Sequence, residues 1–258
     1  MVIDLVLDFD IRSGRTGIGS AGTILAAAER ASLRILWVLE THLHADHLSA
    51  AQHVKAASGA KIAIGDGIGE LQAYFKRLLN VDDCAADGSE FDRLLHDGER
   101  LPLGASEIEI MQTPGHTPIC VSYRIGDAVF VGDTLFMPDY GTARTGFHGG
   151  DASALYRSIR RLLALPPETH LFMCRDCKAP GRDRFPWETR VAEERARNTH
   201  IREEVSEGEF VAMRCARDRT LSMPALILPA IQVNMRAGRL PPAESNGGIY
   251  LKLPRDRL

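Results

Sequence analysis

The segment from Thr41 to His47, Thr-His-Leu-His-Ala-Asp-His, constrains the fold of this chain more than any other. It places three imidazoles and one carboxylate within six residues. Histidine is the commonest metal ligand and a carboxylate adds negative charge, so this density indicates a metal site. The apolar residues 33–40 read as a buried strand and residues 48–55 as the start of a helix. We therefore expect a metal-binding loop at the end of a strand, where rigid scaffolds present functional side chains.

Two further segments carry candidate ligands. Residues 113–118, Thr-Pro-Gly-His-Thr-Pro, put His116 in a tight turn that follows an apolar run. Residues 129–135, Val-Phe-Val-Gly-Asp-Thr-Leu, put Asp133 at the end of a strand, where Gly132 allows close backbone approach. A turn histidine or a strand-end aspartate alone is an ordinary structural feature. Their order after the histidine-rich loop makes both of them candidates for the same metal site.

These motifs together resemble the metallo-β-lactamase superfamily, whose fold is an α/β αββα sandwich with the metal site at the edge between two sheets. Within it, the chain looks like the persulfide dioxygenase (sulfur dioxygenase) branch, in its bacterial β-lactamase hydrolase-like subgroup. The similar segments are residues 41–50, 113–118, 130–144, 191–198 and 246–254. The resemblance covers nearly the whole chain, so we expect this fold throughout.

The resemblance implies an enzyme in which one Fe(II) ion per chain uses O2 to oxidise glutathione persulfide, or a similar thiol persulfide, to sulfite. Its setting would be sulfide detoxification. Carried over residue by residue, the metal ligands would be His42, His116 and Asp133. Two imidazoles and a carboxylate on one face leave iron positions open for both reactants. The resemblance also assigns substrate binding to Arg144 and Thr117, and a guanidinium suits bidentate capture of a carboxylate.

A zinc-dependent hydrolase is the alternative. His44, Asp46 and His47 match ligands of the related hydroxyacylglutathione hydrolases, which cleave a thioester with two metal ions, so they are further candidate ligands. Those relatives complete the second metal site with a histidine where this chain has Arg175. Arginine stays protonated and offers no lone pair. We therefore expect one metal ion, with Arg175 paired to Asp46 or Asp133.

Other departures from the family leave a third interpretation open, a degenerate non-catalytic paralogue. Cys177 stands where the family has a tyrosine, and Gly146 where it has an aspartate. In addition, residues 1–10 read as one strand that in relatives follows roughly two others. We accordingly expect shortened N-terminal strands.

Composition is that of an ordinary globular protein, with 45% hydrophobic and 25% charged residues in 258. We predict a single domain over residues 1–258, with a C-terminal extension from about residue 187. A net charge of −3 gives no cue for nucleic acid or an anionic membrane as partner. Five cysteines, an odd number, favour a cytoplasmic location. The resemblance adds the expectation of a homodimer.

Hydrophobic periodicity predicts alternating strands and helices, which is typical of α/β proteins. Helices are predicted over residues 19–30, 71–79, 152–165 and 187–205, and strands over residues 1–10, 61–65 and 171–173. Ser206 and Glu209 have the spacing of a capping box, so a further helix is predicted to begin there.

Overall fold

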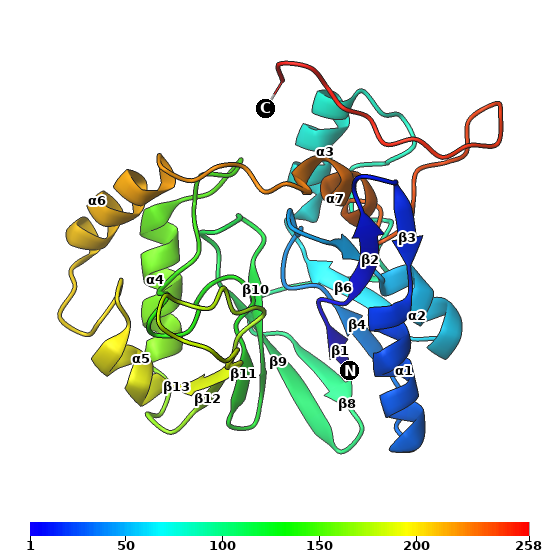
Figure 1. Ribbon diagram of the computed structural model, residues 1–258. Helices are drawn as coiled ribbons and strands as arrows, with labels where there is room; N and C mark the ends of the chain where they lie inside the picture. Colours follow the sequence, from blue (N-terminus) through cyan, green and yellow to red (C-terminus); the bar gives the residue numbers. More distant parts are fainter. Residues whose placement is uncertain (258) are drawn as a thin grey trace. The chain divides into compact units, whose positions relative to one another are not determined.

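The computed structural model describes residues 1–257 and divides the chain into two compact units (Figure 1). The first unit consists of Met1–Leu95 together with the C-terminal segment that begins at Met223. The second unit is His96–Ser222. Each unit has its own main sheet.

The main sheet of the first unit has four strands, all paired in parallel. In spatial order they are β1 (Val2–Ile3), β4 (Trp37–Leu39), β6 (Lys61–Gly65) and β7 (Arg93–Leu95). Parallel neighbours need crossover connections, and these contain α1 (Gly19–Arg30), α2 (Ala51–Ser58) and α3 (Ile68–Leu79). The strand residues Val38, Leu39 and Ile62 are fully buried, as expected for a sheet covered on both faces.

A small antiparallel sheet completes the first unit. Its strands, in spatial order, are β3 (Arg15–Gly17), β2 (Val6–Asp10) and β5 (Leu48–Ser49). Helix α7 (Ile227–Asn234) packs on β5, where Ala230 and Val233 form a buried cluster with Leu48. The C-terminal segment thereby covers the strand that directly follows the histidine-rich loop.

The sheet of the second unit has six strands, antiparallel except for the parallel β11–β12 pair. In chain order they are β8 (Arg100–Leu103), β9 (Ser106–Gln112), β10 (Val121–Ile125), β11 (Ala128–Phe130), β12 (His170–Phe172) and β13 (Glu188–Arg190). The helices of this unit are α4 (Ala152–Leu163), α5 (Val191–Arg197) and α6 (Glu207–Asp218) (Figure 1). The predicted apolar face of α4, with Leu155, Ile159 and Leu162, packs into the main core of the unit.

Most predicted elements are found, but the prediction of a single charged helix over residues 187–205 is wrong. Residues 188–190 instead form β13, which pairs with β12 and buries Thr189. The helix that follows, α5, ends at Arg197. The next residue, Asn198, caps it, and its side-chain oxygen accepts hydrogen bonds from the backbone N–H groups of His200 and Ile201. Sheet pairing and this cap override the helical charge pattern. The capping box of Ser206 and Glu209 is confirmed, with both of its hydrogen bonds formed.

The predicted strand over residues 1–10 is interrupted. It forms β1 and β2, separated by Asp4, whose φ of +51° is incompatible with a continuous strand. The Asp4 carboxylate accepts hydrogen bonds from the backbone N–H of Thr41 at 2.7 Å and from the Thr41 hydroxyl at 2.8 Å. The strand therefore breaks where its aspartate reaches the histidine-rich loop.

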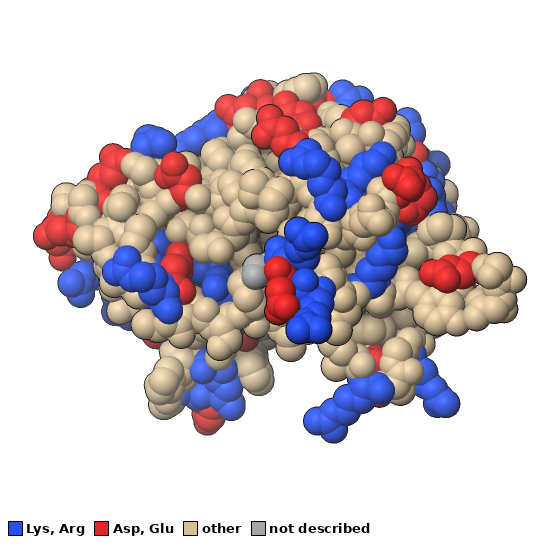
Figure 2. Space-filling view, turned by 90° about the horizontal axis from the view of Figure 1, so that it is seen from above, with Lys and Arg blue, Asp and Glu red and all other residues tan. Residues whose placement is uncertain are grey.

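Charged side chains of both signs are interspersed on the molecular face displayed in Figure 2. This mixture agrees with the small net charge of −3. Among the described residues, no helix combines the length and the apolarity that crossing a membrane requires.

Candidate metal centre

The histidine-rich loop, residues 41–47, runs between β4 and β5 in the first unit. The Thr41 hydroxyl donates its proton to Asp4 Oδ2, and Thr41 Oγ1 lies 2.9 Å from His42 Nδ1. Because that hydroxyl has only one proton, Thr41 Oγ1 accepts from His42, which must carry its proton on Nδ1. The lone pair of His42 is then on Nε2, the tautomer that a metal ligand needs.

His44 is held differently from His42. Its Nε2 lies 2.8 Å from Asp4 Oδ1 and 3.6 Å from Glu40 Oε2, and its ring is nearly fully buried. Burial opposes the charged imidazolium, but the negative charges of Asp4, Glu40 and Asp46 outweigh it and raise the pKa of His44 to about 9. In this arrangement His44 is the cationic partner of buried carboxylates.

The first unit also brings together the three further candidate ligands of the hydrolase alternative. One ligand atom from each of His44, Asp46 and His47 lies within 4.8 Å of the others. His47 Nε2 is buried and has no hydrogen-bond partner among the described residues. Burial, followed by the charge of His44, lowers the pKa of His47. His47 therefore stays neutral with a lone pair available.

His116 lies in the turn between β9 and β10 of the second unit. Gly115 enters this turn with a φ of +143°, and a Cβ there would meet the backbone of Leu155 at 2.3 Å, so α4 packs where only glycine fits. His116 Nδ1 lies 2.7 Å from the carbonyl oxygen of Arg144. A carbonyl only accepts, so the proton is on Nδ1, and His116 Nε2 lies 3.8 Å from Asp133 Oδ2.

Asp133 follows β11, and its two carboxylate oxygens have different surroundings. Arg175 donates from NH2 to Asp133 Oδ2 at 2.7 Å. Asp133 Oδ1 is buried and has no hydrogen-bond partner within residues 1–257. A buried carboxylate oxygen without a donor is costly unless a cation meets it. Asp133 Oδ1 and the His116 lone pair therefore fit a metal ion, and the predicted pairing of Arg175 with Asp133 is confirmed.

The structure thus brings His116 and Asp133 together within the second unit. It places His42 in the first unit, so its binding to the same ion as the other two stays a prediction. Among the residues that sequence reasoning missed, Asp4 orients both His42 and His44. The available signal was an acidic residue inside the apolar run at the N-terminus.

The two predicted substrate-binding residues have partners inside the second unit. Arg144 donates from NH1 to the carbonyl oxygen of Ser222 at 2.7 Å, and its guanidinium lies 4.8 Å from the centre of the Phe147 ring. Arg144 Nε, by contrast, is buried without a hydrogen-bond partner among the described residues. The Thr117 hydroxyl lies 3.1 Å from Cys120 Sγ. The role of both residues in substrate binding stays a prediction.

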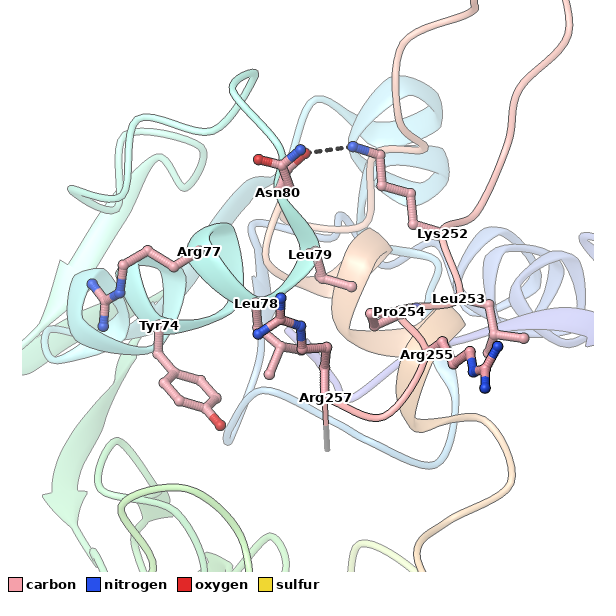
Figure 3. A pocket seen from close by; sticks show the side chains of 10 residues that line it. All are labelled: Tyr74, Arg77, Leu78, Leu79, Asn80, Lys252, Leu253, Pro254, Arg255 and Arg257. Atoms are coloured by element: carbon pink, nitrogen blue, oxygen red, sulfur yellow. Dashed lines mark hydrogen bonds between the residues drawn. The ribbon is translucent and has the colours of Figure 1, made fainter.

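A groove of about 910 Å³ lies in the first unit, and none of the candidate ligands lines it. It is lined by Tyr74, Arg77, Leu78, Leu79, Asn80, Lys252, Leu253, Pro254, Arg255 and Arg257. Figure 3 shows that its cationic side chains point in different directions, with Lys252 bonded to the backbone of Asn80. Because these charges do not converge, the groove lacks the polar focus of a binding site.

The comparisons with known proteins define the class of this protein. A family model of the metallo-beta-lactamase superfamily matches residues 13–173, and the chain belongs to this superfamily. Proteins of this superfamily are usually metal-dependent enzymes. The predicted α/β metallo-β-lactamase fold is confirmed.

Three relatives refine this placement. A protein named probable metallo-hydrolase from Burkholderia pseudomallei is 53% identical, over 100% of this chain and 91% of the relative. A beta-lactamase hydrolase-like protein from Xylella fastidiosa is 48% identical over 100% of this chain, which spans 59% of that relative. The crystal structure of ETHE1 from Myxococcus xanthus matches with a TM-score of 0.70 and 28% identity, over 92% of this chain and 88% of that one. The predicted likeness to the β-lactamase hydrolase-like subgroup is confirmed.

Proposed function

We propose that this chain is a mononuclear non-haem iron dioxygenase that oxidises glutathione persulfide, or a similar thiol persulfide, with O2. One Fe(II) ion would be held by His42, His116 and Asp133. The donor chemistry supports this proposal, because two neutral imidazoles and a carboxylate are the ligands of oxygen-activating ferrous sites. The resemblance of the motifs to persulfide dioxygenases and the structural similarity to ETHE1 support it further.

The observation that carries the proposal is the ion pair between Arg175 and Asp133. Arg175 bonds Asp133 Oδ2, whereas Oδ1 is buried without a donor among the described residues, so we assign Oδ1 to the metal ion. A carboxylate bridges two metal ions through both oxygens or through one, and the bond to Arg175 competes with the two-oxygen mode. The guanidinium charge also opposes a second cation at this position. Both effects favour a one-metal site over the two-metal clamp of the hydrolases.

The proposed reaction consumes RSSH, O2 and H2O and yields RSH, sulfite and two protons, so that the outer sulfur is oxidised and O2 is reduced. When bound, Fe(II) supplies the redox chemistry by which O2 reacts with the persulfide sulfur. The chain's own residues would hold the metal ion and orient the substrate. His42 and His116 present their Nε2 lone pairs, and the guanidinium of Arg144, the residue that the family resemblance assigns to the substrate, would meet a carboxylate of the glutathione portion.

Metal analysis of anaerobically purified protein, combined with an oxygen electrode, tests this proposal. We expect about one iron per chain after reconstitution with ferrous salt. Oxygen uptake should require added persulfide and should be matched by sulfite. Iron-loaded protein that consumes no oxygen with any thiol persulfide would contradict the proposal and favour the degenerate paralogue.

A zinc-dependent thioester hydrolase is the second candidate function. The neighbouring Asp46 and His47 in the first unit favour it, because a carboxylate and a neutral imidazole are donors for a second metal ion. The relative named probable metallo-hydrolase points the same way. Binding of two zinc ions with cleavage of a glutathione thioester, and without oxygen uptake, would establish it in place of the dioxygenase.

A further inference from the structure

We propose that Arg214 and Asp218, both on α6, are positioning residues for the metal ligand His116. They clamp the backbone on both sides of Arg144, so that its carbonyl oxygen faces His116 Nδ1. This inference rests on the proposed function, because it assigns the pair a task at that metal site.

His116 Nδ1–H donates a hydrogen bond to the Arg144 carbonyl oxygen, at 2.7 Å. This bond determines which ring nitrogen carries the proton and therefore which one can bind a metal ion. It also fixes the ring orientation. Such outer partners of a ligand histidine commonly change metal affinity by roughly 10–100-fold. The position of the Arg144 carbonyl is therefore a property that the surrounding structure must control.

The residues that flank Arg144 are anchored on both sides by hydrogen bonds to α6. On one side, Arg214 NH1 donates to the carbonyl oxygen of Thr142 at 3.1 Å. On the other side, Thr145 donates to Asp218 Oδ2 from its backbone N–H at 2.7 Å and from its hydroxyl at 2.9 Å. The two anchors hold residues 142–145 at both ends, and the peptide carbonyl of Arg144 lies between them.

The two anchoring side chains, Arg214 and Asp218, also bind each other. Arg214 Nε and NH2 lie 3.0 Å and 2.8 Å from Asp218 Oδ1, one helical turn apart on α6. Arg214 is only 1% exposed. Loss of one partner from a buried pair leaves an uncompensated charge, so the two side chains hold each other in place. A pair at this spacing normally lies on a solvated helix face; here it faces the segment that presents the carbonyl.

His200, which follows α5, supports the same segment. Its Nδ1 accepts the backbone N–H of Thr142 at 3.0 Å. Burial, and then the positive charge of Arg214, lowers the pKa of His200 to about 4. His200 is therefore neutral and can act as an acceptor. The segment that carries Arg144 is thus tied to α6 and to the residues that follow α5.

The test compares Asp218→Ala with the matched variant Asp83→Ala. Asp83 pairs with Arg236, which is also buried, but this pair lies in the first unit and contacts neither candidate ligand of the second unit. A milder variant, Thr145→Val, removes the hydroxyl bond to Asp218 but keeps the backbone N–H bond, so we expect it to fold. Two quantities are measured: the Fe(II) dissociation constant by chelator competition, and the protonated nitrogen of His116 by ¹⁵N NMR of the metal-free protein.

For Asp218→Ala we expect the Fe(II) dissociation constant to rise about 10-fold or more, with His116 losing its preference for the Nδ1–H form. Thr145→Val should change both quantities in the same direction by less, and Asp83→Ala should change neither. Unchanged affinity and an unchanged His116 tautomer in the folded Asp218 and Thr145 variants would overturn the inference. If the unaltered protein retains no metal, the proposed function fails, whereas the tautomer measurement still decides the positioning role.

Discussion

At the scale of single residues, the two proposed imidazole ligands are prepared in the same way by different partners. His42 is fixed through Nδ1 by the Thr41 hydroxyl, and His116 by a backbone carbonyl. Both bonds leave Nε2 as the nitrogen with the lone pair. The protein therefore determines the tautomer before any metal ion binds, which reduces the cost of assembling the site.

Substitution of His116 by alanine should abolish metal retention, because it removes one of three proposed ligands. His170→Ala is the matched control, since His170 lies in the same unit and pairs with Glu188 outside the candidate ligands. Metal content after gel filtration measures the effect. Equal metal content in both variants would exclude His116 as a ligand.

Replacement of Arg175 by histidine should create a second metal site, because it releases Asp133 Oδ2 and adds an imidazole donor. Arg175→Gln provides the control, since it removes the guanidinium charge but adds no strong ligand. Zinc titration of the two variants should show extra binding in Arg175→His alone. No gain would mean that Arg175 is not the group that excludes a second ion.

The candidate ligands could be predicted from the sequence because their spacing is local. The histidine-rich loop, the turn around His116 and the Gly132–Asp133 pair each lie within a few residues. The supporting residues could not be found in this way. Arg214 and Asp218 have a spacing that is common for surface ion pairs on helices, and only tertiary packing shows that Arg214 is buried against the loop that carries Arg144.

At the scale of elements, long-range pairing determines the secondary structure in the two places where the sequence patterns predicted it wrongly. Residues 188–190 carry the charges of a surface helix, yet they pair with β12 at a sheet edge. The N-terminal apolar run has the periodicity of one strand, yet Asp4 interrupts it to bond Thr41. In both places a long-range hydrogen bond outweighs local propensity, and single-sequence patterns contain no information about such partners.

Gly141 tests how tightly the loop after β11 is held. Its φ is +98°, and a Cβ there would lie 2.2 Å from His200 Nδ1. We expect Gly141→Ala to destabilise the fold by about 3 kcal/mol, from backbone strain together with the steric clash. Gly126→Ala is the control, because Gly126 also has a positive φ but open space around it, and should cost about 1 kcal/mol.

Urea denaturation of the two glycine variants measures these costs. Equal losses would mean that His200 yields to the added methyl group without cost. In that case the loop is less rigid than its hydrogen bonds imply.

At the scale of the whole molecule, the α/β class followed from alternating strand and helix patterns, and the particular fold followed from the ordered motifs. The division into two compact units did not, because residues from Met223 onward pack with the N-terminal half. Their contacts, such as Asn234 with the backbone of His44 and Ser49, join residues more than 180 positions apart. Local patterns do not encode contacts at that distance.

Global stability should depend on pH through Glu194 of α5. Burial raises the pKa of its carboxyl from 4.5 to about 8, and Asn198 donates to one of its oxygens at 2.6 Å. The folded state therefore keeps a proton that the unfolded chain releases from about pH 4.5 upward. Stability should fall as pH rises between about 4.5 and 8, by up to roughly 5 kcal/mol.

Unfolding free energies at pH 5 and pH 8 test this dependence. Glu194→Gln, which cannot ionise, should flatten this contribution, whereas Glu193→Gln at the exposed neighbouring position should not. A slope that is the same in the wild type and in Glu194→Gln would show that Glu194 is not its source.

In the proposed site, one ion binds to His42, His116 and a single oxygen of Asp133 while Arg175 keeps the other oxygen. Anomalous diffraction at the iron edge, from crystals reconstituted with ferrous salt, tests it most directly. We expect one iron peak per chain in contact with these three side chains, with the Arg175–Asp133 ion pair intact. Two metal peaks with Arg175 displaced, or no peak after reconstitution, would contradict it.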